Sequence, residues 1–322
     1  MSNKATLEYL RMNRKVHNLP CAKIEGTPKK LDRKSLTKLF VNKIFNLKGI
    51  LVYFFEISIG IKWMWNLKTL KSSKVQNRSI IIGNGPSQGY LTNEILQGLK
   101  DNKLDIIVVN YWNENVSLSS VVPTYLVISD PHTLSENAPS RLQDRNTALR
   151  KYLLENPTIT LICPIRRCKE LSTIFNKERL IGIVDSDLQY WSSNITPIRP
   201  RGYISMTLYK ALAIAKWFDY EKIYVLGMDN TYPRNIFCNI DNKFINLEQH
   251  AGGDEYTVDQ SKIYPNIGVG LLEISDLYFD SYKFNSDSIY NLDPYSLTDS
   301  FKKINAFSSD NETNISLNKI IR

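Results

Sequence analysis

The sequence is short of the residues that bind metals and form disulfides. It has four cysteines, at positions 21, 163, 168 and 238, and their spacing is neither that of metal ligands nor that of a disulfide scaffold. Only three histidines occur, His17, His132 and His250. A structural zinc site is therefore not expected, and the cysteines predict reduced thiols in a cytosolic protein.

Long uncharged apolar runs are also absent. Glu56 and Lys62 interrupt the most apolar stretch, residues 49–65, so that no run approaches the roughly 18 residues a membrane span needs. The stretch also lies too far into the chain for a signal peptide and lacks a small-residue cleavage site. We therefore expect neither a spanning helix nor a secretory leader.

Apolar residues are nevertheless plentiful, and charge is unevenly distributed. The 322 residues are 43% apolar and 11% aromatic, which suits one large domain, or one domain with additions, and argues against disorder. Residues 1–78 hold 17 Lys and Arg against 4 Asp and Glu, leaving 24 against 28 for the rest. The net charge of +9 thus belongs to the N-terminal segment.

Residues 1–78 therefore form a basic extension with two interpretations. Residues 1–31 are polar without a clear period, whereas apolar side chains recur at helical spacing from Ser35, followed by clustered aromatics. Cations and tryptophans together favour an amphipathic segment lying on an anionic membrane surface. The alternative is a helical pair packed on the body or on a second subunit. No recognised binding module supports a nucleic-acid partner.

The stretch from Ser79 to Ser87, SIIIGNGPS, begins the body of the protein. Three consecutive isoleucines predict a strand buried on both faces, and a helix is expected over 90–100. Gly83 and Gly85 allow a tight turn and a close approach of the backbone to a ligand. Gln88 stands where a dinucleotide fingerprint has its third glycine, and no Walker ending follows. A ligand loop and an ordinary tight turn both fit.

Further apolar runs alternate with helical patterns and predict an α/β fold: a mostly parallel sheet with helices on both faces. The expected strands are 104–110, 124–129, 158–163, 180–184, 222–226 and 288–292, with a helix over 203–216. Asn84, Asn110, Asp130 and Asp229 each follow a strand, where ligands bind in such sheets. Each is alternatively a turn cap.

The C-terminal part divides in two. Residues 230–267 form a long polar excursion, which predicts a lid or an acceptor-side segment after a nucleotide-binding core over 79–229. Residues 268–322 are expected to complete the core with a helix over 271–282 and the late strand, and to end in a frayed tail from Lys302.

Three motifs resemble one family. IIGNGPS, the segment Ile204–Asp229 (ISMTLYKALAIAKWFDYEKIYVLGMD) and, more weakly, IYNLDPYSL resemble the bacterial sialyltransferases of glycosyltransferase family 42. The matches cover most of 79–301 and none of 1–78. The resemblance implies a single Rossmann-like, GT-A-variant domain with a lid. It also implies inverting, metal-independent transfer of a nonulosonic acid from a CMP-sugar to a glycan of a lipopolysaccharide, O-antigen or other surface polysaccharide.

The resemblance also implies roles for residues. The nucleotide side would comprise Gly83, Asn84, Gly85, Ser87, Asn110, Asp130, Ser205, Thr207 and Asp229. Asp130 stands where the family has an asparagine, Ser205 and Thr207 are alternatives for one hydroxyl, and Asp229 would contact the cytidine. Tyr232 would stabilise the leaving phosphate, assisted by Arg201 or Arg199.

The catalytic base departs from the family pattern. The family has a histidine just before the helix matched to 271–282, where this sequence has KIYPNIGVG. His250, within the expected lid and beside Gly252 and Gly253, is the candidate that can take the acceptor's proton near neutrality. The alternative is a surface histidine without a role. His132, and after it Asp254 or Glu255, are the reserves.

The sequence thus predicts a cytoplasmic, membrane-peripheral glycosyltransferase, with no cofactor or metal and possibly homo-oligomeric. Its partners would be a CMP-sugar donor, a lipid-linked glycan acceptor and an anionic inner-membrane surface reached through residues 1–78. Three alternatives stay open: a donor such as CMP-Kdo or a UDP-sugar, a magnesium-dependent pyrophosphokinase, and a non-catalytic scaffold of polysaccharide assembly.

Overall fold

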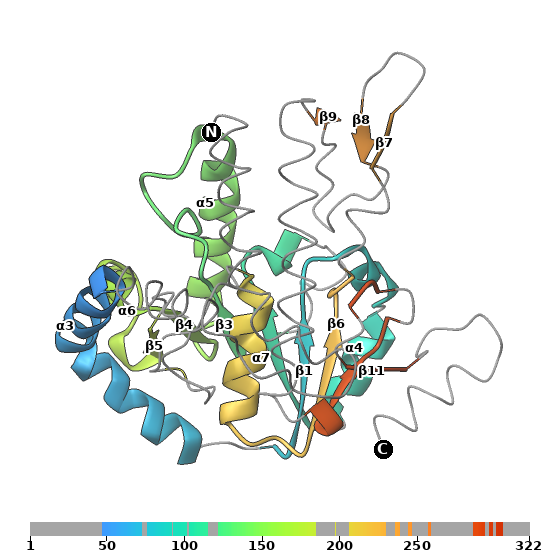
Figure 1. Ribbon diagram of the computed structural model, residues 1–322, viewed down its shortest axis with the longest axis horizontal. Coiled ribbons are helices and arrows are strands. Elements are labelled where there is room, and N and C mark those ends of the chain that lie inside the picture. Colours follow the sequence, from blue (N-terminus) through green and yellow to red (C-terminus); the bar gives the residue numbers. More distant parts are fainter. Residues whose placement is uncertain are drawn as a thin grey trace, which may run out of the picture.

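The computed structural model is an α/β structure built on one large sheet (Figure 1). It describes residues 47–72, 76–91, 93–101, 103–114, 122–184, 197, 206–229, 236–238, 244–246, 257–258, 286–293, 296–298 and 301–304. The irregular structure expected for 1–31 and the helix expected over 271–282 lie outside these residues.

Eight strands form the large sheet, and each of its pairings is parallel. They are β1 (Arg78–Ile82), β2 (Leu104–Val109), β3 (Tyr125–Val127), β4 (Thr160–Pro164), β5 (Leu180–Ile183), β6 (Lys222–Leu226), β10 (Ile289–Asn291) and β11 (Lys302–Lys303). The order across the sheet is β11-β10-β6-β1-β2-β3-β4-β5. This confirms the predicted Rossmann-like fold class.

The strand order reverses beside β1. From β1 the chain adds β2 to β5 in one direction, then returns to place β6 on the other side of β1. Such a reversal leaves a crevice beyond the carboxyl ends of the two central strands, where open α/β sheets bind ligands. The turn that follows β1 is the GNGPS segment.

The isoleucine run of β1 contributes to two separate cores, one on each face of the sheet. Ile80 and Ile82 pack into one apolar cluster and Ile81 into the other, and all three are at most 1% exposed. Alternation along a strand places successive side chains on opposite faces, so a strand covered on both must be apolar throughout. Burying each isoleucine contributes about 1.5–3 kcal/mol.

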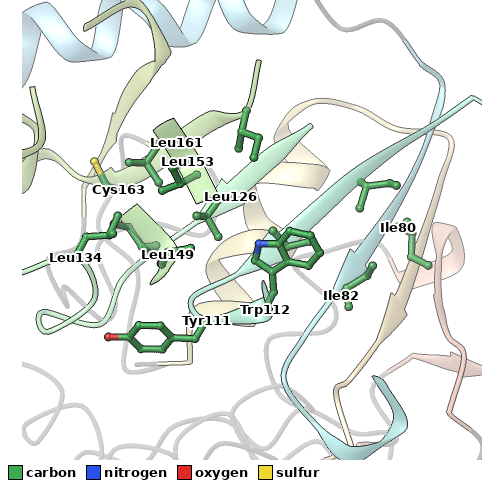
Figure 2. Close-up of a cluster of buried hydrophobic side chains, with 14 of the residues drawn as sticks. Ile80, Ile82, Tyr111, Trp112, Leu126, Leu134, Leu149, Leu153, Leu161 and Cys163 are labelled. Carbon is green, nitrogen blue, oxygen red and sulfur yellow. The ribbon is translucent and has the colours of Figure 1, made fainter. Parts of the chain in front are cut away.

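Helices cover both faces. α7 (Thr207–Trp217) packs on the Ile81 face. The other face is covered by α4 (Asn93–Asp101) and α5 (Ser140–Glu155), and α6 (Ile165–Leu171) also contributes to it. Figure 2 shows this second core, with Leu149 and Leu153 of α5 beside Leu126 and Leu161 of the sheet. Short 3-10 turns occupy Pro86–Tyr90, Trp112–Glu114, Lys177–Arg179 and Ser286–Ser288.

α3 (Leu47–Ser72) runs along the β5 edge of the sheet, at the left of Figure 1. Its contact with β5 and α6 depends on two glycines. A Cβ on Gly60 would lie 2.1 Å from the Ile165 side chain, and one on Gly182 would lie 3.0 Å from Trp63 Cβ. Trp63 is 5% exposed in this contact. The helix therefore packs on the body, over β5 and α6.

The segment expected to form a lid contains a second, small sheet. β7 (Ile236–Cys238), β8 (Phe244–Asn246) and β9 (Thr257–Val258) pair antiparallel in that order. In Figure 1 these strands stand beyond the end of β6 from which the crevice opens. Their action as a lid stays a prediction.

Three local features differ from the sequence prediction. Lys302 does not begin a frayed tail but pairs with Tyr290 as the edge strand β11, an edge position where lysines are typical. The first helix of the body begins at Asn93 and not at Tyr90, because Pro86–Tyr90 form a 3-10 turn. α5 and α6 were not predicted. Among the described residues, no helix is long and apolar enough to cross a membrane.

Candidate functional site

The turns that follow β1 and β6 are bonded to each other at the crevice. Gly83 N–H donates to the Leu226 carbonyl at 2.7 Å, and Gly85 N–H donates to the Gly227 carbonyl at 3.1 Å. Gly227 adopts a φ of +75°, a conformation that favours glycine. A Cβ on Gly227 would lie 2.3 Å from the Gly83 carbonyl oxygen.

The same contacts explain why the turn needs glycines. A Cβ on Gly85 would lie 1.8 Å from Asp229 Oδ2, and one on Gly83 would lie 2.5 Å from the Gly227 carbonyl oxygen. The sequence left two interpretations of these glycines open, a ligand loop and an ordinary tight turn. In the structure, the group they admit is the neighbouring turn of the protein itself.

Ser87 and Asp229 hold the two turns together with reciprocal hydrogen bonds. Ser87 N–H donates to Asp229 Oδ1 at 3.1 Å, and Gly227 N–H donates to Ser87 Oγ at 2.9 Å. Both side chains are buried, with 2% and 4% exposed. Their described contacts therefore build the crevice wall, and the predicted contact of Asp229 with a cytidine stays a prediction.

Asp229 forms a carboxyl pair with Asp293, which follows β10. Burial, and after it a hydrogen bond with Asp293, raise the pKa of Asp229 to about 7, while the hydrogen bonds from Ser87 oppose the shift. A hydrogen bond between two carboxyl groups needs one proton between them. Asp229 thus exchanges a proton near neutral pH at the wall of the crevice.

Asn110 and Thr207 meet at the same edge of the sheet. Asn110 follows β2 with a φ of +47°, and its Nδ2 donates to Thr207 Oγ1 at 3.1 Å. Asn110 Oδ1 is buried and has no hydrogen-bond partner among the residues that the structure describes. Thr207 is the first residue of α7, so the positive end of the helix dipole lies beside this amide.

Ser129 completes this cluster and was missed by the sequence analysis. Its Oγ lies 2.7 Å from Thr207 Oγ1, and the residue is 6% exposed. Ser129 is the last residue of the strand expected over 124–129. Asn110 was identified because it is a polar residue at a strand end, and the same signal could have identified Ser129. Asn110, Ser129 and Thr207 together present a cluster of amide and hydroxyl groups.

Asp130 is a turn cap in the structure. Its Oδ1 accepts a hydrogen bond from His132 N–H at 2.7 Å, and its carbonyl accepts from Thr133 N–H at 3.2 Å. This is the alternative that the sequence left open for strand-end carboxylates. The side chain of His132, the reserve base, is exposed at this turn.

Several predicted residues lie outside the described part of the chain. They are Arg199, Arg201, Ser205, Tyr232, His250, Asp254 and Glu255. Their roles stay predictions. Of the two alternative hydroxyl residues, Thr207 is the one that the structure describes, and it contacts Asn110.

Metal-binding side chains do not cluster in the described residues: no group of three or more His, Cys, Asp or Glu is placed to hold an ion. Cys163 and Cys168 are free thiols 3.5 Å apart, buried between β4 and α6.

Comparisons with known proteins give one distant structural similarity. No protein-family model matches the sequence, and no curated protein matches it. Among solved structures, the chain is similar to the MAf glycosyltransferase from Magnetospirillum magneticum AMB-1, with a TM-score of 0.42 and 12% identity over 78% of this chain. The match spans 38% of that protein, so this chain corresponds to well under half of its length.

Proposed function

We propose that this protein is a glycosyltransferase that transfers a nonulosonic acid from a CMP-sugar donor to a glycan, with inversion and without a metal ion. The main support is the meeting of Asn110 with Thr207 beside the turn carrying Asn84. These residues come from separate segments, and the motif resemblance assigns all three to the nucleotide. They lie at the strand ends where α/β sheets bind nucleotides.

The described residues would bind the nucleotide part of the donor or hold the groups that bind it in place. Asn84 and Asn110 would bind the nucleotide and its phosphate, with the α7 N-terminus favouring the negative charge. Thr207 and Ser129 would fix the Asn110 amide. Asp229 and Ser87 would hold the GNGPS turn at the crevice.

The transfer itself would use predicted residues that lie outside the described part of the chain. The acceptor hydroxyl oxygen attacks the anomeric carbon, while the bond from that carbon to the phosphate oxygen breaks. His250 accepts the hydroxyl proton, and CMP leaves with the electron pair of the broken bond. The Tyr232 hydroxyl and the Arg201 guanidinium stabilise the phosphate charge, which supplies the assistance that other transferases take from a metal.

Nucleotide binding measured by thermal shift tests this proposal. CMP, CDP, UMP, UDP, GDP and ATP are compared in EDTA and in magnesium. We expect CMP to raise the melting temperature equally in both, because the binding groups are amides, hydroxyls and backbone N–H groups. Asn110→Ala should lose the CMP shift, whereas Asn137→Ala, an exposed asparagine elsewhere, should retain it.

Other outcomes identify the alternatives. A shift only with a diphosphate nucleotide and magnesium would contradict the proposal and favour a pyrophosphokinase. A shift with UMP or UDP, and none with CMP, would indicate that the donor is a UDP-sugar and not a CMP-sugar. With CMP binding established, His250→Ala should abolish transfer and retain the shift. Binding without transfer in the unmodified protein would favour a scaffold.

A further inference from the structure

α3 is buried against the body on one side and presents large apolar side chains on the opposite side. Glu56, Gly60 and Trp63 share the side that packs on β5 and α6. Glu56 and Trp63 are 6% and 5% exposed there. A helix that is apolar all round is normally covered all round, so the other side is expected to have a partner.

The outward side presents five large apolar residues. They are Leu51, Phe54, Phe55, Ile59 and Ile61, each between 49% and 66% exposed. We call these five residues the outward face. Ser58 lies among them and donates its hydroxyl to the Phe55 carbonyl at 2.8 Å, so its polar group is satisfied within the helix. A partner can therefore cover the outward face without burying an unsatisfied hydroxyl group of Ser58.

The charged residues of the chain segment that contains the outward face are almost all positive. Residues 33–78 hold ten Lys and Arg and a single acid, Glu56, whose side chain is buried against the body. Lys62 of α3 is exposed, whereas the ammonium of Lys71 lies over the Trp217 ring of α7. Residues 1–32 add seven cationic residues against three acids. A second copy packed face to face would bring like charges together, whereas an anionic surface complements them.

We infer that the outward face of α3 docks on an anionic lipid bilayer, with the helix axis in the plane of the headgroups. A basic helix with aromatic and aliphatic side chains on its free side has the chemistry of an interfacial anchor. Its 26 residues span about 39 Å along the surface. The inference goes beyond the proposed function and does not depend on it, because it uses no residue of the crevice.

Vesicle co-sedimentation of the full chain tests the inference. Vesicles of phosphatidylcholine containing phosphatidylglycerol are compared with vesicles of phosphatidylcholine alone. We expect binding to the anionic vesicles that weakens as salt is raised, because surface attraction is screened within a Debye length. The double change Phe54→Ser, Phe55→Ser should lower the partition coefficient by roughly tenfold or more.

Leu154→Ser is the matched control. Leu154 is 55% exposed on α5, comparable with Phe54 and Phe55 but on another element, so its change should leave vesicle binding unaltered. Both variants should keep the melting temperature of the unmodified protein, since the altered side chains are exposed. Measuring that temperature separates lost docking from lost folding.

A second pair of variants tests the charge argument. Ile59→Glu and Ile59→Lys both remove apolar surface, but only the first places an anion against the lipid. The Glu variant should bind anionic vesicles more weakly than the Lys variant. Equal binding of the two, no vesicle binding by the unmodified chain, or a dimer that the Phe54/Phe55 change dissociates would each overturn the inference.

Discussion

At the scale of single residues, Asp229 connects three segments of the crevice. Its side chain accepts from Ser87 N–H and pairs with Asp293, while its carbonyl accepts from Leu297 N–H at 2.9 Å. The turn after β1, the end of β6 and the segment after β10 are therefore coupled through one buried residue.

The raised pKa of Asp229 makes part of the stability depend on pH. An unfolded carboxyl titrates near about 3.9, whereas Asp229 in the fold titrates at about 7. Between these values the folded state binds a proton that the unfolded state has lost. Stability from this group is therefore complete below about pH 4 and falls as the pH rises to about 7.

Asp229→Asn should remove this decline. The asparagine keeps the acceptor for Ser87 N–H but carries no titrating proton. Urea unfolding between pH 5 and 8 should show a smaller loss of unfolding free energy in the variant, by on the order of 1–3 kcal/mol. Asp219→Asn, at an exposed position, is the control. An unchanged decline in Asp229→Asn would contradict the assignment.

At the scale of elements, the sequence predicted strands better than helices. The strands were found because β1, β2 and β6 are buried on both faces, which requires β-branched and apolar runs. α5 was not found because Asn146 interrupts its buried stripe of Leu142, Leu149 and Leu153. β11 is only two lysines, whose strand conformation is set by pairing with β10 and not by their own propensity.

The residues of the candidate site were likewise predicted only in part. Strand-end positions were visible because a strand fixes where its last residue lies, so Asn110 was found. The contact of Asn110 with Thr207 was not predictable from spacing, because 97 residues separate them. The capping role of Asp130 was one of the two interpretations that the sequence left open, whereas the partner of Gly85, a turn from a distant strand, was not visible in the sequence.

Asn146 is a polar hub of α5, and its loss should destabilise the whole domain. Its Oδ1 accepts from Tyr111 O–H at 2.8 Å and Leu134 N–H at 2.7 Å, and its Nδ2 donates to two carbonyls. Asn146→Ala removes all four hydrogen bonds at once and takes the acceptor from the buried Leu134 N–H, so we expect a loss of roughly 3 kcal/mol. Urea unfolding measures it.

Thr147→Ala provides the comparison for that experiment. Thr147 is the next residue of α5, is exposed, and makes one hydrogen bond, to the Gln143 carbonyl. Its change should cost well under 1 kcal/mol. Similar losses in the two variants would mean that the Asn146 hydrogen bonds contribute little.

At the scale of the whole molecule, α3 is part of the folded body as well as of the basic extension. The helix covers β5 and α6, so cutting the chain at residue 78 would remove a structural element. The point at which the extension can be separated from the body therefore lies before Leu47.

Two truncations test this division. Removing residues 1–46 leaves every described element intact and should preserve the melting temperature. Removing residues 1–74 exposes the apolar surface of β5 and α6 that Trp63 covers, so it should lower the melting temperature and promote aggregation. Light scattering during a thermal melt reports both effects. Equal stability of the two truncated proteins would show that α3 is dispensable.

The position of α3 at one end of the strand order has a geometric consequence. Five strand spacings, of about 4.8 Å each, separate β5 from β6, and α3 lies roughly another 10 Å beyond β5. A chain resting on lipid through α3 would hold its crevice on the order of 30 Å above the headgroups. The width of the sheet would then set a minimum length for a lipid-linked acceptor. A glycan of only one or two sugars would end below the crevice, whereas a longer one would reach it.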